Sequence, residues 1–230
     1  MKKLGIIGGL GPLATAYFFR CVTMISEAAH DQDHMEVFIH SKPDIPKRVE
    51  YILGKSDVSP TTALVSVARG LQSQGAEVLA MPCVTAHYFY DEIAGQVEIP
   101  IINMVDETIR YLLKQNIASV GILATEATVR CQYLQGKLIE NGIQVLVPDA
   151  MGQRRINEII FDQIKVGKEP ELSGFYRTAD ELFLKGAQIN LLACTELSIL
   201  KQTGKISEGY LDMMDVLAME AVKRCGILKT

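Results

Sequence analysis

Short aliphatic runs alternate with helix-like segments along the whole chain, and this alternation constrains the fold more than any other feature of the sequence. The segment at 59–75 shows the helical half of the pattern: Ser59-Pro60 begins it, apolar residues recur every three or four positions, and Gly75 ends it. Strands joined by helices in this way form a parallel sheet. The chain is therefore predicted to be an α/β protein, with strands and their turns near 4–9, 37–39, 78–81, 100–103, 119–125, 144–147 and 189–193.

The pattern restarts halfway along the chain, which indicates an internal repeat. The opening strands contain Gly5 and Gly121, 116 residues apart, and two strand-end cysteines, Cys83 and Cys194, are 111 residues apart. These similar spacings predict two similar lobes, each a parallel sheet flanked by helices, with a pseudo-two-fold axis and the active site between them. The final helix is expected to return to the first lobe. The predicted lobes are 1–104 plus 208–230, and 105–207.

Charge, hydropathy and cysteine usage exclude several classes of protein. The 230 residues have a formal net charge of −4 and no run of Lys and Arg, which argues against a nucleic-acid partner. No uncharged apolar stretch reaches the roughly 18–20 residues that a membrane span needs. Glycines and Pro12 interrupt the apolar run after Lys2 and Lys3, so no signal peptide is expected. Five scattered cysteines suit a reducing compartment, and we expect a soluble cytoplasmic protein.

The first predicted strand ends in a glycine-rich turn, GGLGP at 8–12. Glycines at a strand end let backbone N–H groups approach an anion. Residues 9–14 also fit the dinucleotide fingerprint, but the second strand ends in His40 rather than in an acid, and Pro12 removes one N–H. Three interpretations stay open: a dinucleotide site, a plain tight turn, and a site for a small carboxylate, which we favour.

Cys83 and Cys194 each end a predicted strand, and each is followed within two residues by a threonine. Ligands bind at the carboxyl ends of parallel strands, and a helix N-terminus there lowers the pKa of a thiol from about 8.5. Either cysteine taken alone is typical of a buried core residue. Two cysteines at equivalent points of the two predicted lobes instead indicate a pair of bases that act on opposite sides of one carbon. His87 fits either an assistant of Cys83 or a packing residue. A metal site is not expected, because the paired C-x2-C or H-x3-H spacing is missing.

Several segments together follow the pattern of one family. They are GGLGPLAT at 8–15, PDIPKR at 43–48, PCVTAH at 82–87, ACTEL at 193–197, the lysine-bearing helix at 156–165 before Gly167, and Asp212 before the last helix. In these segments the chain resembles the aspartate/glutamate racemase family, and within it the aspartate racemases. The resemblance extends over nearly the whole chain.

The resemblance implies racemisation of an acidic amino acid, with aspartate as the expected substrate, by two bases and without a cofactor such as pyridoxal phosphate. Cys83 and Cys194 are the implied catalytic pair, with Cys83 serving the D-enantiomer and Cys194 the L-enantiomer. The expected partner is a small amino acid, and the expected assembly is a homodimer. The implied substrate-binding positions are Leu10, Arg48, Val84, Thr85, Thr125, Lys165, Thr195 and Glu196.

The implied roles of these side chains follow their chemistry. Thr85 and Thr195 would hold the α-carboxylate, while Arg48 and Lys165 would hold the side-chain carboxylate and stabilise the charge that develops on the α-carbon. Glu196, beside the second cysteine, would orient or deprotonate that thiol, or simply stabilise a helix start.

The chain departs from the family pattern at two places that bear on its substrate. Val84 stands where the family has Asn, and Glu126 stands in a turn that reads Thr-x-Gly-Thr in the family, adding negative charge near the expected site. The alternatives are therefore a glutamate racemase, a broad amino-acid racemase, a maleate-type isomerase, or a non-catalytic amino-acid-binding relative. A more distant alternative is an NAD-dependent dehydrogenase. Cys21, Cys131 and Cys225 are expected in the core.

Overall fold

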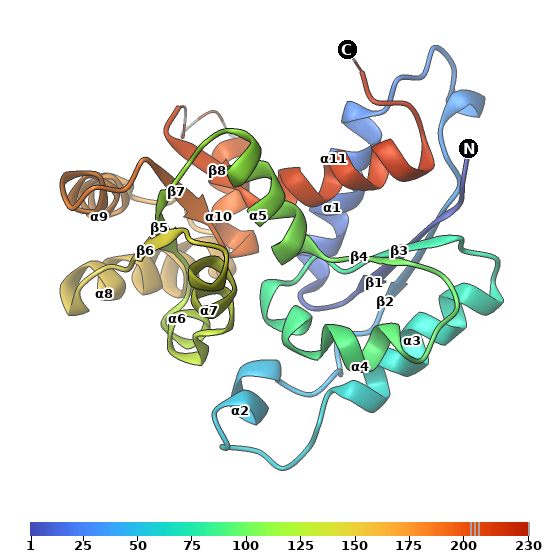
Figure 1. The fold of residues 1–230 in the computed structure, drawn as a ribbon, viewed down its shortest axis with the longest axis horizontal. Helices are drawn as coiled ribbons and strands as arrows, with labels where there is room; N and C mark the ends of the chain where they lie inside the picture. Colours follow the sequence, from blue (N-terminus) through green and yellow to red (C-terminus); the bar gives the residue numbers. More distant parts are fainter. Residues whose placement is uncertain (203, 205, 207, 230) are drawn as a thin grey trace. The chain divides into compact units, whose positions relative to one another are not determined.

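The structure is a computed structural model that describes residues 1–202, 204, 206 and 208–229. The chain forms two compact units (Figure 1). The first contains Met1–Glu107 together with the chain that follows Met213, and the second is Thr108–Met213. Among the described residues, no helix is long and apolar enough to cross a membrane.

The first unit is built on a parallel sheet of four strands in the order β2-β1-β3-β4. Strand β1 is central in this sheet and is hydrogen-bonded on both sides: its residue Ile6 is opposite Ile39 of β2 and Ala80 of β3. All five residues of that strand are buried, as its aliphatic composition requires. The strands are β1 (Leu4–Gly8), β2 (Val37–Ser41), β3 (Val78–Ala80) and β4 (Ile101–Ile102).

Helices cover both faces of this sheet, with α3 and α4 on one side and α1 and α11 on the other (Figure 1). The predicted apolar stripe of α3 is confirmed, because Leu64, Val67, Ala68 and Leu71 are fully buried in the core of the unit. The helices and 3-10 segments are α1 (Pro12–Ile25), η1 (Asp31–Asp33), α2 (Arg48–Ile52), α3 (Thr61–Ser73), η2 (Val84–Phe89), α4 (Tyr90–Ala94), the first turn of α5 (Met104–Lys114), and α11 (Met213–Cys225).

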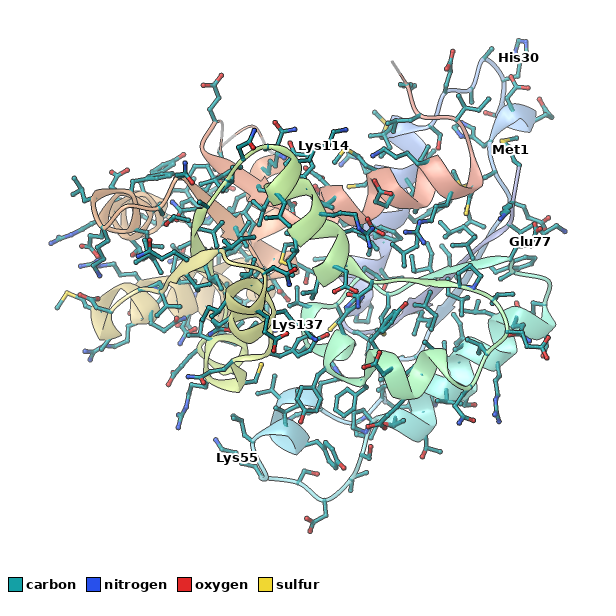
Figure 2. The ribbon with its side chains drawn as sticks, viewed as in Figure 1. Met1, His30, Lys55, Glu77, Lys114 and Lys137 are labelled. Carbon is teal, nitrogen blue, oxygen red and sulfur yellow. The ribbon has the colours of Figure 1, made fainter. Side chains whose placement is uncertain are left out.

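Both ends of the chain are held in the first unit. The Lys2 N–H donates to the Cys225 carbonyl at 2.8 Å, and Leu228 forms an antiparallel bridge with Ser26. The Lys3 N–H donates to the carboxylate of Glu77, which is labelled in Figure 2, at 2.9 Å. The last helix is thereby tied to the start of the first sheet.

The second unit repeats the plan with a parallel sheet in the order β6-β5-β7-β8. Its strands are β5 (Ser119–Leu123), β6 (Gln144–Leu146), β7 (Ile189–Leu192) and β8 (Tyr210–Asp212). Its helical segments are the rest of α5, α6 (Glu126–Cys131), α7 (Tyr133–Glu140), α8 (Ala150–Glu158), the π-helix η3 (Ile159–Gln163), η4 (Ile164–Val166), α9 (Ser173–Leu184) and α10 (Thr195–Gln202). The predicted fold class, two similar lobes with parallel sheets flanked by helices, is confirmed.

Two elements of the second unit differ from the sequence prediction. The sequence predicts one continuous helix between the strand at 119–125 and Asn141-Gly142. The structure instead breaks this segment into α6 and α7 at Gln132, whose φ of 55° lies in the left-handed region. The strand β8 was not predicted; it is formed by only three residues and gains its hydrogen bonds from β7, where Leu191 is opposite Leu211. Hydrogen bonds to β7, rather than a local run of apolar residues, make this segment a strand.

Candidate active site

Cys83 follows β3, the third strand of the first sheet along the chain, and is itself extended with φ −158°. Its N–H donates to the Met81 carbonyl at 2.8 Å, and its own carbonyl accepts from the Ala86 N–H at 3.2 Å. These bonds turn the chain into η2 and leave the thiol largely buried, with its Sγ 3.5 Å from the Thr85 hydroxyl. A hydroxyl at that place can donate to a thiolate.

His87 fixes the backbone around Cys83 from inside the unit. Its Nε2 accepts from the Met104 N–H at 3.0 Å, so the ring proton is on Nδ1, which donates to the Cys83 carbonyl at 2.8 Å. Burial lowers the pKa of His87 from 6.5 to about 4, so the ring is neutral at neutral pH. Both ring nitrogens are engaged with backbone groups, and His87 is therefore a brace of the cysteine loop rather than a base for the thiol.

The other predicted residues of the first unit differ in what they offer a ligand. Leu10 packs in the same hydrophobic core cluster as Cys83, and its side chain offers no polar atom. Val84 is buried beside Cys83 and offers no polar atom. Arg48 begins α2 and donates from Nη1 to the carbonyls of Ile45 and Pro46, while its Nε is buried without a hydrogen-bond partner among the described residues. Arg48 thus retains donors for an anion.

The glycine turn after β1 is held together largely by its own groups. The Gly9 N–H donates to the Thr15 hydroxyl at 2.9 Å, and that hydroxyl donates to the Gly11 carbonyl at 3.0 Å. Gly9 has φ +90°, and a Cβ there would lie 2.4 Å from the backbone of Lys42. Close packing and backbone conformation therefore require this glycine, and its N–H is not directed at a ligand.

Cys194 follows β7, the third strand of the second sheet along the chain, and precedes α10. Its thiol donates to Glu196 Oε2 at 3.0 Å, and the Thr195 hydroxyl donates to the same oxygen at 3.2 Å. The other carboxylate oxygen, Oε1, lies 3.4 Å from Lys165 Nζ. The structure thus brings four predicted site residues of the second unit into one cluster.

The expectation that a helix N-terminus lowers the pKa of the thiol is wrong for Cys194. Burial and the negative charge of Glu196 raise the pKa of Cys194 well above its usual value. The opposing effects of the backbone hydrogen bond from Glu196 and of the Lys165 charge do not offset them. Cys194 is therefore a protonated thiol at neutral pH in this structure.

The helix that carries Lys165 changes form before it reaches this residue. After α8, the chain passes through the π-helical turn η3 and the 3-10 turn η4, which ends at Gly167 with φ +73°. The ammonium lies 4.7 Å from the centre of the Phe161 ring, in a cation–π contact. Such π-helical turns are frequent at functional sites.

Thr125 and Glu126 lie at the start of α6, where local contacts occupy their side chains. The Thr125 hydroxyl caps the helix by accepting from the Thr128 N–H at 3.2 Å. The Glu126 carboxylate is half exposed and pairs with Arg130 at 3.5 Å, so its charge is partly balanced within its own helix.

Gln153 is a residue of this region that sequence reasoning missed. Its side-chain amide donates to the Ala124 carbonyl at 2.9 Å and to Asn157 Oδ1 at 3.2 Å, and Asn157 Oδ1 also accepts from the Glu126 N–H. Gln153 and Asn157 together hold α8 against the end of β5. Its signal in the sequence is two amides four residues apart on one helix face.

Metal ligation has no support in the described part of the chain, where no group of three or more His, Cys, Asp and Glu side chains could hold an ion.

Comparison with known proteins places these observations in a family. A family model described as Asp/Glu/Hydantoin racemase matches residues 7–221. The chain is 28% identical over 199 residues to the broad specificity amino-acid racemase RacX of Bacillus subtilis (strain 168), covering 85% of this chain and 86% of RacX.

Two solved structures are similar to the chain over nearly all of its length. One is Picrophilus torridus aspartate racemase, with a TM-score of 0.81, 30% identity, and coverage of 100% of this chain and 96% of that chain. The other is an aspartate racemase homologue from Pyrococcus horikoshii OT3, with a TM-score of 0.81, 25% identity, and coverage of 97% and 99%.

Proposed function

This chain belongs to the Asp/Glu/hydantoin racemase family and is an amino-acid racemase, and from that premise we propose that it interconverts the enantiomers of aspartate by two-base proton transfer without a cofactor. One base removes the α-proton from one face of the substrate carbon, and the other returns a proton to the opposite face. We assign these roles to Cys83, which serves D-aspartate, and Cys194, which serves L-aspartate.

The equivalent placement of the two cysteines is the observation that carries this assignment. Cys83 follows β3 and Cys194 follows β7, and each of these is the third strand along the chain in its own sheet. The two sheets have the same strand order. The carboxyl ends of parallel strands are where α/β proteins bind ligands. A thiol at this point in both units supports the proposal that these two cysteines are the pair of bases that inversion at one carbon requires.

The carbanion formed by proton removal needs positive charge and hydrogen-bond donors. We assign the α-carboxylate to the hydroxyls of Thr85 and Thr195, and the side-chain carboxylate to Arg48 and Lys165. Donors aimed at charge that grows in the transition state lower the barrier more than they tighten substrate binding. Arg48 contributes through the N–H groups that its own loop does not use.

Aspartate is the favoured substrate because the proposed site offers two cations and the similar structure from Picrophilus torridus is an aspartate racemase. A second candidate is racemisation of neutral amino acids. It is favoured by the apolar Val84 beside Cys83 and by the likeness to a racemase described as having broad specificity.

A panel of amino acids incubated with the protein in D2O tests this function. Proton NMR follows exchange of the α-proton, and chiral chromatography follows formation of the opposite enantiomer. We expect both signals for aspartate from either enantiomer, without added cofactor. Exchange of neutral amino acids alone would refute the aspartate assignment, and no exchange with any amino acid would refute racemisation.

We also propose that the enzyme works in the cytoplasm, since two free catalytic thiols persist in a reducing compartment. A homodimer is proposed from the family resemblance, and sedimentation equilibrium tests it.

A further inference from the structure

The carboxylate of Glu196 contacts the hydrogen-bond donor and the cation that the proposed function assigns to the substrate. Its Oε2 accepts from the Cys194 thiol at 3.0 Å and from the Thr195 hydroxyl at 3.2 Å, and its Oε1 lies 3.4 Å from Lys165 Nζ. Thr195 and Lys165 are the groups proposed to hold substrate carboxylates. In the structure they hold the carboxylate of Glu196 instead.

The residues that follow Cys83 in the chain provide no counterpart of this carboxylate. The residues that follow Cys83 are Val84, Thr85 and Ala86, none of which is acidic. The thiol of Cys83 lies near a hydroxyl, whereas the thiol of Cys194 donates to an anion. The two thiols of the proposed pair therefore differ in how they are held before substrate arrives.

We propose that Glu196 acts as a built-in stand-in for the substrate's carboxylate: the arriving carboxylate takes Thr195 and Lys165 from Glu196, and Glu196 then takes the proton of Cys194. The proposal rests on the proposed function for the identity of the substrate groups. It adds the regulation of the second thiol, which becomes a thiolate only when a carboxylate ligand is present.

Exchange of partners on one carboxylate is the physical basis. A cation and hydrogen-bond donors stabilise the ionised form of a carboxylate, so losing two of three donors makes it accept a proton more readily. The thiol is the donor that remains, because Cys194 and Glu196 are two residues apart at the start of one helix. Lys165 is able to change partners, since its side chain is 44% exposed while that of Glu196 is 20% exposed.

The raised pKa of Cys194 agrees with this arrangement, because it keeps the thiol protonated while Glu196 is ionised. An empty enzyme then carries no thiolate at this position. Since thiolates, rather than thiols, react with oxidants and alkylating agents, the arrangement protects Cys194 between turnovers.

The proton transfer from Cys194 to Glu196 is balanced over one turnover that begins with L-aspartate. The Sγ–H bond of Cys194 breaks and an O–H bond forms on Glu196, leaving a thiolate. The thiolate takes the α-proton, the electron pair of the C–H bond passes into the carbanion, and Cys83 donates its thiol proton to the opposite face. After product leaves, Glu196 loses its proton to solvent and the Cys83 thiolate regains one from solvent.

The ultraviolet absorbance of the thiolate tests the proposal without requiring turnover. Succinate, a dicarboxylate with no amino group, serves as the ligand, and calorimetry establishes its saturation. We expect succinate to raise thiolate absorbance in the wild-type enzyme but not in Cys194→Ser or Glu196→Gln. Binding of succinate without a rise would overturn the proposal, as would an equal rise in Glu196→Gln.

A ligand-free arm uses Thr195→Val, which removes one donor to Glu196 without changing charge. We expect roughly a tenfold increase in the thiolate fraction, the low end of what a hydrogen bond to a charged group is worth. Thr23→Val is the control, because the Thr23 hydroxyl donates to the Phe19 carbonyl within its own helix, and this variant should leave thiolate absorbance at the wild-type level. A Thr195→Val enzyme with wild-type absorbance would contradict the proposal.

The proposed function is tested separately from this handover. A protein that racemises aspartate without any thiolate response refutes the stand-in role of Glu196 alone. A protein that shows the thiolate response but exchanges no α-proton refutes the proposed function instead.

Discussion

Burial of His87 makes the stability of the protein depend on pH in a predictable direction. The ring is 1% exposed, and its pKa is lowered from 6.5 to about 4 mainly because burial disfavours the charged imidazolium. The unfolded chain therefore binds more protons than the folded chain between these values. The contribution of His87 is fully present above about pH 6.5 and is lost as the pH falls toward about 4.

The size of the effect follows from the difference between the two values. One unit of pKa corresponds to about 1.4 kcal/mol, so the full contribution is about 3 kcal/mol. Lowering the pH from about 7 to about 5 covers the steepest part of the window and should remove about 2 kcal/mol from the free energy of unfolding.

Urea denaturation of the wild type and of His87→Gln at these two pH values measures the contribution of His87 to the free energy of unfolding. Glutamine also offers one donor and one acceptor, for the Cys83 carbonyl and the Met104 N–H, but it does not titrate. We expect the wild type to lose about 2 kcal/mol more than the variant on acidification. If both proteins lose the same amount, the buried neutral histidine is not what links stability to pH here.

Three further predictions concern the site and the core. Arg48→Ala should lower kcat/KM for aspartate roughly 10- to 150-fold, equivalent to about 1.5–3 kcal/mol, whereas the nearby exposed Lys47→Ala should not; equal activity would contradict the carboxylate clamp. Val84→Asn restores a polar partner for substrate and should raise kcat/KM for aspartate about tenfold, and an unchanged value would make Val84 a neutral packing residue. Gly121→Ala would place its Cβ 2.0 Å from Asn190 Oδ1 and should destabilise the protein by about 1–3 kcal/mol in urea denaturation, with a smaller loss in an Asn190→Ala background; an unaffected single variant would refute this packing.

Much of the fold follows from local pattern in the sequence. The aliphatic runs predict the central strands, and the stripe of α3 predicts its buried face, because burial of apolar side chains dominates both. The strand β8 is different: Tyr210–Asp212 has no such run and is a strand because β7 lies beside it. The break at Gln132 likewise has no glycine or proline to signal it.

The sequence predicts which residues belong to the candidate site better than it predicts their charge contacts and pKa shifts. The motifs point to Cys194 and Glu196 as neighbours in the chain, but not to Lys165, 31 residues earlier, as the partner of that carboxylate. Lys165 follows a π-helical turn, which the local sequence does not reveal. The pKa direction of Cys194 depends in turn on the Glu196 rotamer and on burial, so the expectation from the helix terminus alone was wrong.

The direct test of the two-base assignment is racemisation by single-cysteine variants, measured by chiral chromatography from each enantiomer separately. Removal of either base should abolish racemisation in both directions, since inversion requires one acceptor and one donor on opposite faces. We therefore expect no racemisation by Cys83→Ser or Cys194→Ser, and a wild-type rate for the control Cys131→Ser, whose thiol donates to the Thr128 carbonyl within its own helix. A Cys194→Ser enzyme that racemises aspartate at a near wild-type rate would show that the two cysteines are not the pair of bases.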